Sequence, residues 1–517
     1  MPREKSPVTS QSQIRMTWRG RREAEAELET PTSLEWRWEA SGSFEWESAQ
    51  GVLLEADNLD ALKFLQNRYL HQVQLIYLDP PYNLGRQFIY RDPACRDEWL
   101  SMMFPRLTLA KNLLCDRGTM MVSVDDETVH LLRILLDEIF GPENHVATFT
   151  WETKRAARGR PPQSMVMSNH EYVVCYARDA SQVRLKGLPR ELSGFSNPDD
   201  DPRGPWRSES MKATGSRENR FSFSDPQTGF EFGGSWAFSQ ETIQSMIQDD
   251  LILFPKTREG VPRQKKHFNA YLNTTKAGIT SLGWHSTERA TKELQELFDG
   301  ERVFPFPKPL SLMRYLLNQA LQDGDLVLDL FAGSGSTGHA AWLESLDRSI
   351  SLRFILIQRP ESFDPTSDLN QGAARLCNRE RLPFKISSIT KERLRRASLQ
   401  LECLLPFGLR CFMQSAEVAS DQPEAKLMRL LLESKLDLTA RLEELTSERE
   451  LFYLTNSEIY LFAADVLDLQ SVSAIKKHMS DRQLLKSRLI LFEHAAENIH
   501  ALFRSEEKHS QVSVEMI

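Results

Sequence analysis

The chain has few cysteines, no long apolar run and no excess of positive charge. Its six cysteines are scattered over 517 residues without a CxxC pair, which argues against a zinc site and against a disulfide scaffold and fits a reducing compartment. No apolar stretch approaches the roughly 18 residues of a membrane helix. The polar N-terminus, MPREKSPVTSQSQ, lacks the apolar centre of a signal peptide. We therefore expect a cytoplasmic protein that does not contact membranes.

The charge balance is slightly acidic, with 64 Lys and Arg against 72 Asp and Glu and a net charge of -8. Taken alone, this balance speaks against nucleic-acid binding. A basic face can still meet phosphates, and two segments are locally basic: KRAARGR (154–160) and PKTREGVPRQKKH (255–267). Either segment alone would be interpreted as a solvated loop, but the two together favour a phosphate-facing surface.

Strand and helix patterns alternate over most of the chain, which predicts an α/β fold with a Rossmann-like, doubly wound, mostly parallel sheet. Between about 180 and 300 the alternation stops and prolines, glycines and aromatic residues dominate; this length indicates an inserted module, and its Trp and Phe residues are expected to form a small core of their own. The expected strands are 51–57, 73–78, 119–125, 146–152, 171–178, 325–331 and 353–359, and the expected helices are 58–70, 96–118, 127–141, 309–321 and 336–346. Asn58 is a candidate helix N-cap, and Pro105 should kink or split its helix.

These patterns divide the chain into five parts. They are an N-terminal arm (1–50) with four tryptophans, the first part of the α/β domain (51–179), the insertion (180–300), the second part of the α/β domain (301–405) and a small C-terminal domain (406–517). The leucines of the C-terminal domain are expected to form either a core or a dimer contact.

The segment VQLIYLDPPYNLG (73–85) ends an apolar strand abruptly. Pro80 and Pro81 cannot continue a strand ladder, so Asp79 and Tyr82 are held on a stiff turn at the carboxyl end of the strand. In open α/β sheets, ligands bind at this end. A strand-end cap is the alternative role for Asp79.

The segment DGDLVLDLFAGSGSTGHAAW (323–342) runs from an apolar strand through a glycine-rich turn into a helix. The letters from Gly333 to Gly338 match GxGxxG, which leaves an NAD or FAD site as a rival interpretation. Asp329 and Phe331 complete a D-x-F-x-G-x-G pattern that is typical of methyltransferases that use S-adenosylmethionine. The next strand ends near Gln358 and Glu361, and either side chain could meet the ribose of a cofactor.

Both turns should lie on one rim of the sheet, where a methyl donor and a flat substrate could meet. Asp79 and the backbone carbonyl of Pro80 can accept the two N–H hydrogens of an exocyclic amine on a nucleobase. Tyr82 can stack on the base, an interaction worth about 1–3 kcal/mol. A base inside a duplex cannot reach such a pocket, which implies base flipping. This chemistry requires no metal and no covalent enzyme intermediate.

With these motifs in this order, the chain resembles a β-class amino-methyltransferase of DNA, in which the target-recognition module lies between the two motifs. More narrowly, it resembles the modification (Mod) subunit of type III restriction-modification systems. The segments that carry this resemblance are MTWRGRREA (16–24), LLEADNLDALKFLQ (53–66), LIYLDPPYN (75–83), SNHEYVVCYAR (168–178), FPFPKPLSLMRYLL (304–317), FILIQRPE (354–361) and ISSITKERLRRA (386–397).

The resemblance implies an S-adenosylmethionine-dependent, site-specific DNA methyltransferase of the prokaryotic cytosol. The Asp before the two prolines favours adenine N6 as the target; cytosine N4, or a chain that serves mainly as the DNA-recognition subunit of a larger restriction complex, remains an alternative. The implied partners are double-stranded DNA, a helicase-nuclease restriction subunit and a second copy of the chain.

The resemblance also assigns roles to residues. The implied catalytic residues are Asp79, Pro80, Pro81 and Tyr82. The implied cofactor-binding residues are Asp57, Lys308, Pro309, Asp329, Phe331, Gly333, Gly335, and Gln358 or Glu361. Asp57 could instead be only a helix N-cap, Lys308 could be a surface lysine, and Gln358 stands where family members carry a ribose-binding carboxylate.

Overall fold

The computed structural model divides the chain into two compact units, residues 1–185 with 279–517 (unit 1) and Lys186–Gly278 (unit 2). Unit 2 is narrower than the expected insertion of 180–300, because a strand and a helix after residue 278 belong to unit 1. The structure describes residues 15–31, 35–82, 93–155, 165–213, 220–271, 274–401, 407–415, 423–445, 451–454, 459–463, 469–482, 484, 486–491 and 511–517.

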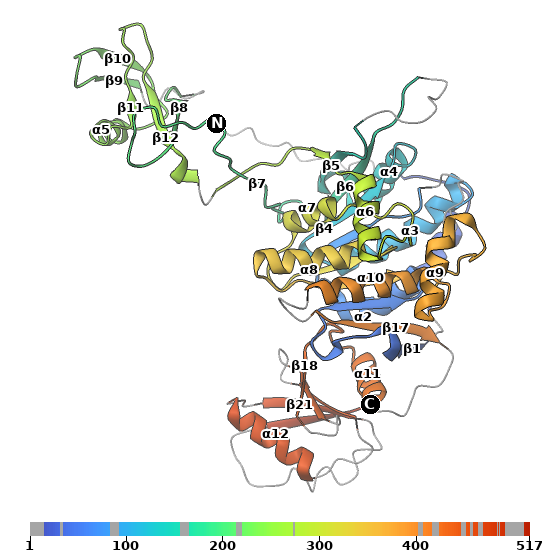
Figure 1. Cartoon of the computed structure of the whole chain (residues 1–517). Coiled ribbons are helices and arrows are strands. Elements are labelled where there is room, and N and C mark those ends of the chain that lie inside the picture. Colours follow the sequence, from blue (N-terminus) through green and yellow to red (C-terminus); the bar gives the residue numbers. More distant parts are fainter. Residues whose placement is uncertain are drawn as a thin grey trace. The chain divides into compact units, whose positions relative to one another are not determined.

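Unit 1 is built around a ten-stranded sheet, most of whose strands are parallel (Figure 1). In spatial order the strands are β1 (Glu35–Trp38), β17 (Leu409–Ser415), β2 (Gly51–Glu55), β16 (Arg353–Gln358), β15 (Leu326–Asp329), β3 (Val73–Leu78), β4 (Leu114–Val124), β6 (His170–Ala177), β5 (His145–Glu152) and β14 (Ser281–Trp284). β1 and β6 run antiparallel to their neighbours. The prediction of a doubly wound, mostly parallel α/β sheet is confirmed.

Helices cover both faces of this sheet, because the central strands β2 and β3 are buried at every position and most of their side chains are apolar. On β3, Ile76 and Leu78 pack into one core with helices of the first half of the chain, whereas Leu75 and Tyr77 pack into the other. The first layer is α2 (Asn58–Tyr69), α3 (Arg96–Leu113) and α4 (Val129–Phe140); the second is α7 (Leu310–Ala320), α8 (Ser336–Arg348) and α10 (Ile386–Leu401). The remaining helices of this part are α1 (Arg21–Glu27), α6 (Thr287–Leu297) and α9 (Gln371–Glu380).

The connections that leave the neighbouring strands β15 and β3 lead to opposite sides of the sheet. These two strands are parallel neighbours, with Asp329 paired to Tyr77. The chain leaves β3 towards α3 and β4 on one face of the sheet, and it leaves β15 towards α8 and β16 on the other. Such a divergence of the connections opens a crevice at the carboxyl ends of the strands, which is where α/β proteins bind ligands.

Two local expectations are wrong. The N-cap of α2 is Asp57 rather than Asn58: Asp57 is extended and its side chain accepts a hydrogen bond from the amide of Leu59. The predicted helix 96–118 ends at Leu113, where β4 begins at once, and it runs unbroken through Pro105. Burial of that helix against the sheet outweighs the hydrogen bond that a proline removes.

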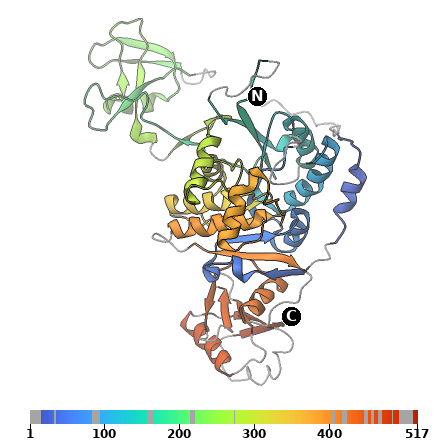
Figure 2. The ribbon, with the colours of Figure 1, turned by 45° about the vertical axis from the view of Figure 1, so that its right-hand side comes forward.

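Unit 2 is a small module with its own aromatic core. Figure 2 shows its short strands in green. Its elements are β7 (Leu188–Pro189), β8 (Trp206–Ser210), β9 (Arg220–Ser224), β10 (Glu231–Ser235), α5 (Gln240–Gln248), β11 (Ile252–Leu253), β12 (Arg263–His267) and β13 (Thr275–Lys276). The core holds Phe223, Phe232 and Trp236, as expected from the sequence.

The structure describes only one of the two basic segments in full. In the segment 255–267, the buried Lys265 forms ion pairs of 2.7 Å with Asp199 and 3.0 Å with Asp250. These pairs neutralise the lysine, so it is not available to meet a phosphate. Most of the segment 154–160 lies outside the described residues.

Described segments from both terminal parts of the chain pack against the core of unit 1. Trp36 and Trp46 of the N-terminal segment contact the core of unit 1. The C-terminal part adds α11 (Pro423–Glu433), α12 (Leu469–Asp481) and a five-stranded sheet of β18 (Leu442–Glu444), β19 (Leu451–Leu454), β20 (Ile459–Phe462), β21 (Lys486–Leu491) and β22 (Gln511–Met516). Leu427 and Leu431 of α11 are fully buried in the core. None of the helices in the described ranges combines the length and apolar character needed to cross a bilayer.

Candidate active site

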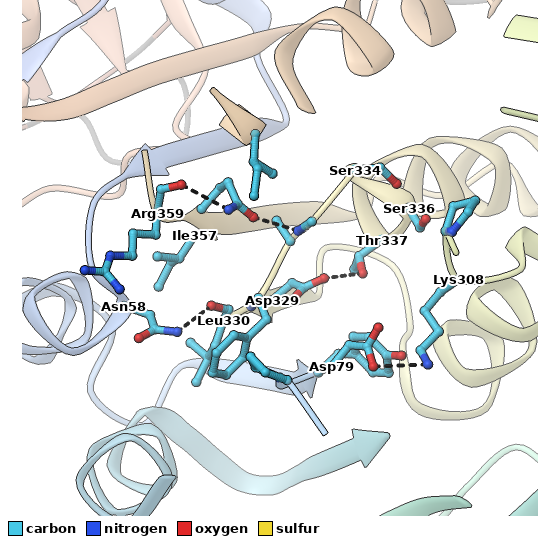
Figure 3. A pocket seen from close by; sticks show the side chains of 18 of the residues that line it. Asn58, Asp79, Lys308, Asp329, Leu330, Ser334, Ser336, Thr337, Ile357 and Arg359 are labelled. Atoms are coloured by element: carbon cyan, nitrogen blue, oxygen red, sulfur yellow. Dashed lines mark hydrogen bonds and ion pairs between the residues drawn. The ribbon is translucent and has the colours of Figure 1, made fainter. Parts of the chain in front are cut away.

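One pocket lies where the two turns meet, at the carboxyl ends of β3 and β15 (Figure 3). It encloses about 1030 Å³, its open mouth included. Of the residues singled out in the sequence, nine line it: Asp57, Asp79, Pro81, Lys308, Asp329, Phe331, Gly333, Gln358 and Glu361. The remaining four lie outside the lining: Pro80, Tyr82 and Gly335 belong to the two turns, and Pro309 follows Lys308 as the N-cap of α7.

The Asp-Pro-Pro-Tyr turn carries a compact cluster of charges. The ammonium of Lys308 lies 3.1 Å from Oδ1 of Asp79 and 2.9 Å from Oε2 of Glu171. The Tyr82 hydroxyl donates to Oδ1 of Asp79 at 2.6 Å, and Lys308 also donates to that hydroxyl. The rings of Tyr82 and Trp151 flank the ammonium at 4.9 and 5.7 Å. Lys308 is therefore a largely buried ion-pair partner of the Asp79 carboxylate, not a surface lysine.

Burial and charge pull the pKa values of this cluster in opposite directions. Burial raises the pKa of Asp79, the Lys308 ammonium opposes this shift, and the Glu171 carboxylate adds to it. For Lys308, burial disfavours the charged form, but Asp79 and Glu171 together raise its pKa above the ordinary value. Lys308 is therefore a permanent cation between two carboxyl groups.

The glycine turn holds Asp329 with neutral donors. Its Oδ1 accepts from the amide of Phe331 at 2.9 Å, and its Oδ2 accepts from the Thr337 hydroxyl at 2.5 Å (Figure 3). The side chain is almost fully buried. Burial raises the pKa of Asp329 to about 7, although both hydrogen bonds act against the shift and the charge of Asp79 adds to it.

Other side chains fix the shape of the glycine turn. The Gln358 amide oxygen accepts from the amide of Gly333 at 2.7 Å, and its amide nitrogen donates to the carbonyl of Arg359 at 3.0 Å. The Thr390 hydroxyl donates to the Gly333 carbonyl at 2.5 Å. Gly335, with φ of 84°, ends the turn as the N-cap of α8, a conformation that favours glycine. Gln358, at the end of β16, thus stabilises the glycine turn. It occupies the position at which members of the resembling family carry a ribose-binding carboxylate.

Asp57 also lines the pocket and has two structural partners. Besides capping α2, its Oδ1 accepts from Nη2 of Arg106 at 2.8 Å. The next residue, Asn58, donates to the carbonyl of Leu330 at 2.9 Å. Asp57 is therefore both an N-cap and a pocket residue.

Sequence reasoning missed three residues of the site. Glu171 falls within one of the segments that carry the resemblance, but nothing local indicates that its strand runs antiparallel and begins at this rim. Arg106 lies inside a helix whose contacts are set by tertiary packing. Thr337 follows the glycine turn directly, and a hydroxyl in the first turn of a helix is the signal that could have found it.

The comparisons with known proteins agree with this geometry. The DNA methylase family (N6_N4_Mtase) matches residues 73–363, more than half of the chain and the whole stretch that carries both turns. The chain belongs to this family of DNA methylases.

Individual relatives match over different lengths. The chain is 31% identical over 333 residues to the StyLTI Mod subunit of a type III restriction-modification enzyme from Salmonella typhimurium, which covers 57% of this chain and 50% of that protein. It is 24% identical to the EcoP15I Mod subunit of Escherichia coli, covering 86% of this chain and 81% of that protein. The type II methyltransferase M.KpnI of Klebsiella pneumoniae is 29% identical, covering 68% and 88%.

Solved structures that match include the cytosine-N4-specific PvuII DNA methyltransferase. It shares 13% sequence identity, covers 68% of this chain and 93% of that chain, and has a TM-score of 0.34. The M1.HpyAVI–SAM complex shares 15% identity, covers 63% and 99%, and has a TM-score of 0.29.

Proposed function

We propose that the protein methylates DNA at adenine N6, with S-adenosylmethionine as the methyl donor and a flipped base as the acceptor. The observation that carries the proposal is the adjacency of the two turns on β3 and β15 around one pocket. A methyl group passes over a short distance only, so donor and acceptor must occupy neighbouring sites.

The glycine-turn side of the pocket suits the proposed cofactor. Asp329 is a buried carboxyl whose two hydrogen-bond partners are both uncharged, so it suits the ammonium of an amino acid. Phe331, Gly333 and Asp57 line the space beside it and would hold the rest of the molecule. When bound, S-adenosylmethionine would supply an electrophilic methyl group on a sulfonium.

The chain's own residues would activate the target amine. The lone pair of an exocyclic amine is delocalised into the base, which makes it a weak nucleophile. Asp79 and the carbonyl of Pro80 would accept its two N–H hydrogens and favour a pyramidal nitrogen. As the nitrogen bonds to the methyl carbon, the carbon–sulfur bond of the donor would break and its electron pair would stay on sulfur, leaving a neutral thioether. The nitrogen would then carry a positive charge and lose one proton. Burial raises the pKa of Asp79, so this carboxylate is suited to receive that proton before passing it to water.

The other parts of the chain complete the proposal. Unit 2 would read the target sequence, because it is a separate module inserted between the two motifs. A type III helicase-nuclease subunit and a second copy of the chain are the proposed partners, by analogy with the Mod subunits above, and the prokaryotic cytosol is the proposed location.

Transfer of a tritiated methyl group to plasmid DNA tests the proposal. The wild type should label DNA, and Asp79→Ala should lower the rate by at least about 100-fold, since it removes the acceptor of the reacting amine. A matched Asp60→Ala variant, in the first turn of α2 and outside the pocket lining, should keep full activity. No labelling by the wild type, or equal labelling by Asp79→Ala, would refute the proposal.

Cytosine N4 is a second candidate target, since the matched family is named for both N6 and N4 methylation. Mass spectrometry of the digested, labelled DNA separates the two. We expect N6-methyladenine; N4-methylcytosine alone would overturn the choice of base while leaving the chemistry intact.

A further inference from the structure

Glu171 lies beside Asp79 and Lys308 because its strand, β6, is antiparallel to the neighbouring strands. β6 is antiparallel to β4, with Tyr172 paired to Val124 at the carboxyl end of β4. Its first residues therefore lie at the rim where the parallel strands end. Glu171 points a carboxylate at the same ammonium that holds Asp79.

The arrangement raises a problem for the proposed chemistry. Asp79 must accept a hydrogen from the target amine, and Lys308 and the Tyr82 hydroxyl already occupy its Oδ1, so the amine would have to use Oδ2. A cation bound to Asp79 also opposes the positive charge that develops on the amine nitrogen. If Asp79 were the only carboxylate present, Lys308 would remain paired with it, because a buried cation without a partner is costly.

We propose that Glu171 is a positioning residue that holds the Lys308 ammonium when the target amine binds Asp79. The proposal rests on the proposed function and adds a partner exchange to it. Lys308 is already 2.9 Å from Glu171, slightly closer than its 3.1 Å to Asp79, so the exchange requires only a small movement.

Two further observations support this exchange. The rings of Tyr82 and Trp151 lie at 4.9 and 5.7 Å from the ammonium, and aromatic faces stabilise a cation at such distances. The three charged groups also sum to one negative charge. Once Lys308 has moved to Glu171, that charge resides on Asp79, where it stabilises the positive charge that develops on the amine.

Kinetics of the full-length protein on DNA test the role of Glu171. Glu171→Gln keeps the shape of the side chain and its ability to accept a hydrogen bond but removes the charge. We expect its single-turnover methyl-transfer rate to fall by about 10–100-fold, the range typical of residues that orient a reacting group through another side chain. KM for the cofactor and for DNA should stay within about twofold, and Glu171→Asp should recover part of the rate.

A double-mutant cycle with Lys308→Met shows whether Glu171 acts through the lysine. In the Lys308→Met background, Glu171→Gln should cause little further loss. Glu143→Gln, an exposed glutamate outside the pocket, serves as the matched control and should leave the rate unchanged.

The outcomes separate the inference from the function it extends. An active wild type with an equally active Glu171→Gln variant would overturn the role of Glu171 alone. The role of Glu171 would also be overturned if the whole effect of Glu171→Gln lay in KM. The same holds if Glu171→Gln lowered the rate as much in the Lys308→Met background as in the wild type. A wild type that transfers no methyl group would overturn the proposed function and the inference together.

Discussion

Two carboxyl groups at neighbouring strand ends, Asp79 and Asp329, have different surroundings in one pocket. Asp79 faces the Lys308 cation, whereas Asp329 accepts hydrogen bonds only from an amide and a hydroxyl among its partners described above. Burial raises the pKa of both carboxyl groups, that of Asp329 to about 7, and the Lys308 ammonium opposes the shift at Asp79. At the residue scale, this difference in surroundings suits the roles proposed above, with Asp79 at the reacting amine and Asp329 at a cationic group of the cofactor.

The pKa of Asp329 predicts that cofactor binding depends on pH. An ammonium ligand needs the ionised carboxylate, which is the minor form below pH 7 and the major form above it. The dissociation constant for S-adenosylmethionine should therefore become about fivefold smaller between pH 6 and pH 7. Isothermal titration calorimetry at the two pH values measures this change.

Two variants check the source of that pH dependence. Asp329→Asn should bind weakly and equally at both pH values, whereas Asp79→Asn should retain the wild-type trend. A wild-type affinity that is constant from pH 6 to pH 7 would contradict the raised pKa of Asp329 as its cause.

At the scale of elements, the glycine turn depends on two left-handed residues, and Gly335 has the tighter surroundings. A Cβ placed there would lie 3.2 Å from Cγ2 of Thr390, the residue that also fixes the Gly333 carbonyl. Gly335→Ala should destabilise the protein by about 1–2 kcal/mol and weaken binding of S-adenosylmethionine at least tenfold, because the turn must shift.

Gly324→Ala is the matched control for this prediction. Gly324 has a similar φ of 77°, but a Cβ there would meet nothing within 4 Å, and it lies outside the pocket lining. This variant should lose a similar amount of stability in thermal unfolding and keep its affinity for the cofactor. Equal affinity losses in the two variants would indicate that backbone strain in general, and not the shape of the turn, controls binding.

Local patterns predict much of this element-level structure. The strand before Asp79, the strand before Asp329 and the helix after Gly335 all appear as expected, because apolar runs, prolines and glycines act over a few residues. The direction of β6 does not follow from such patterns, since a strand has the same apolar content whichever way it runs. The location of Glu171 beside Asp79 and Lys308 therefore cannot be predicted from the sequence. The continuity of α3 through Pro105 is hidden for a similar reason, as burial against the sheet decides it.

At the scale of the whole molecule, unit 2 can be considered separately from the methylase core. It has its own aromatic core, and the described residues that line the pocket all belong to unit 1. Replacing 186–278 by a glycine–serine linker should therefore leave the affinity for S-adenosylmethionine within about threefold of the wild type. Sequence-specific DNA binding and methyl transfer should be lost, because the proposed reading module is absent.

Calorimetry and gel-shift measurements on this deletion variant check whether unit 1 alone binds the cofactor and whether unit 2 is needed to bind the target sequence. The unaltered chain is the control for both. Loss of cofactor binding in a variant that still unfolds cooperatively would contradict the independence of the pocket, and retained site-specific methylation would contradict the reading role of unit 2.

The most direct measurement is a crystal structure of the protein with an S-adenosylmethionine analogue that carries an amine in place of the transferable methyl group. The account predicts that the analogue's amino-acid ammonium contacts Asp329 and that the replaced methyl position faces Asp79 across the pocket. An analogue bound with that position turned away from Asp79, or bound outside the space between the two turns, would contradict the account.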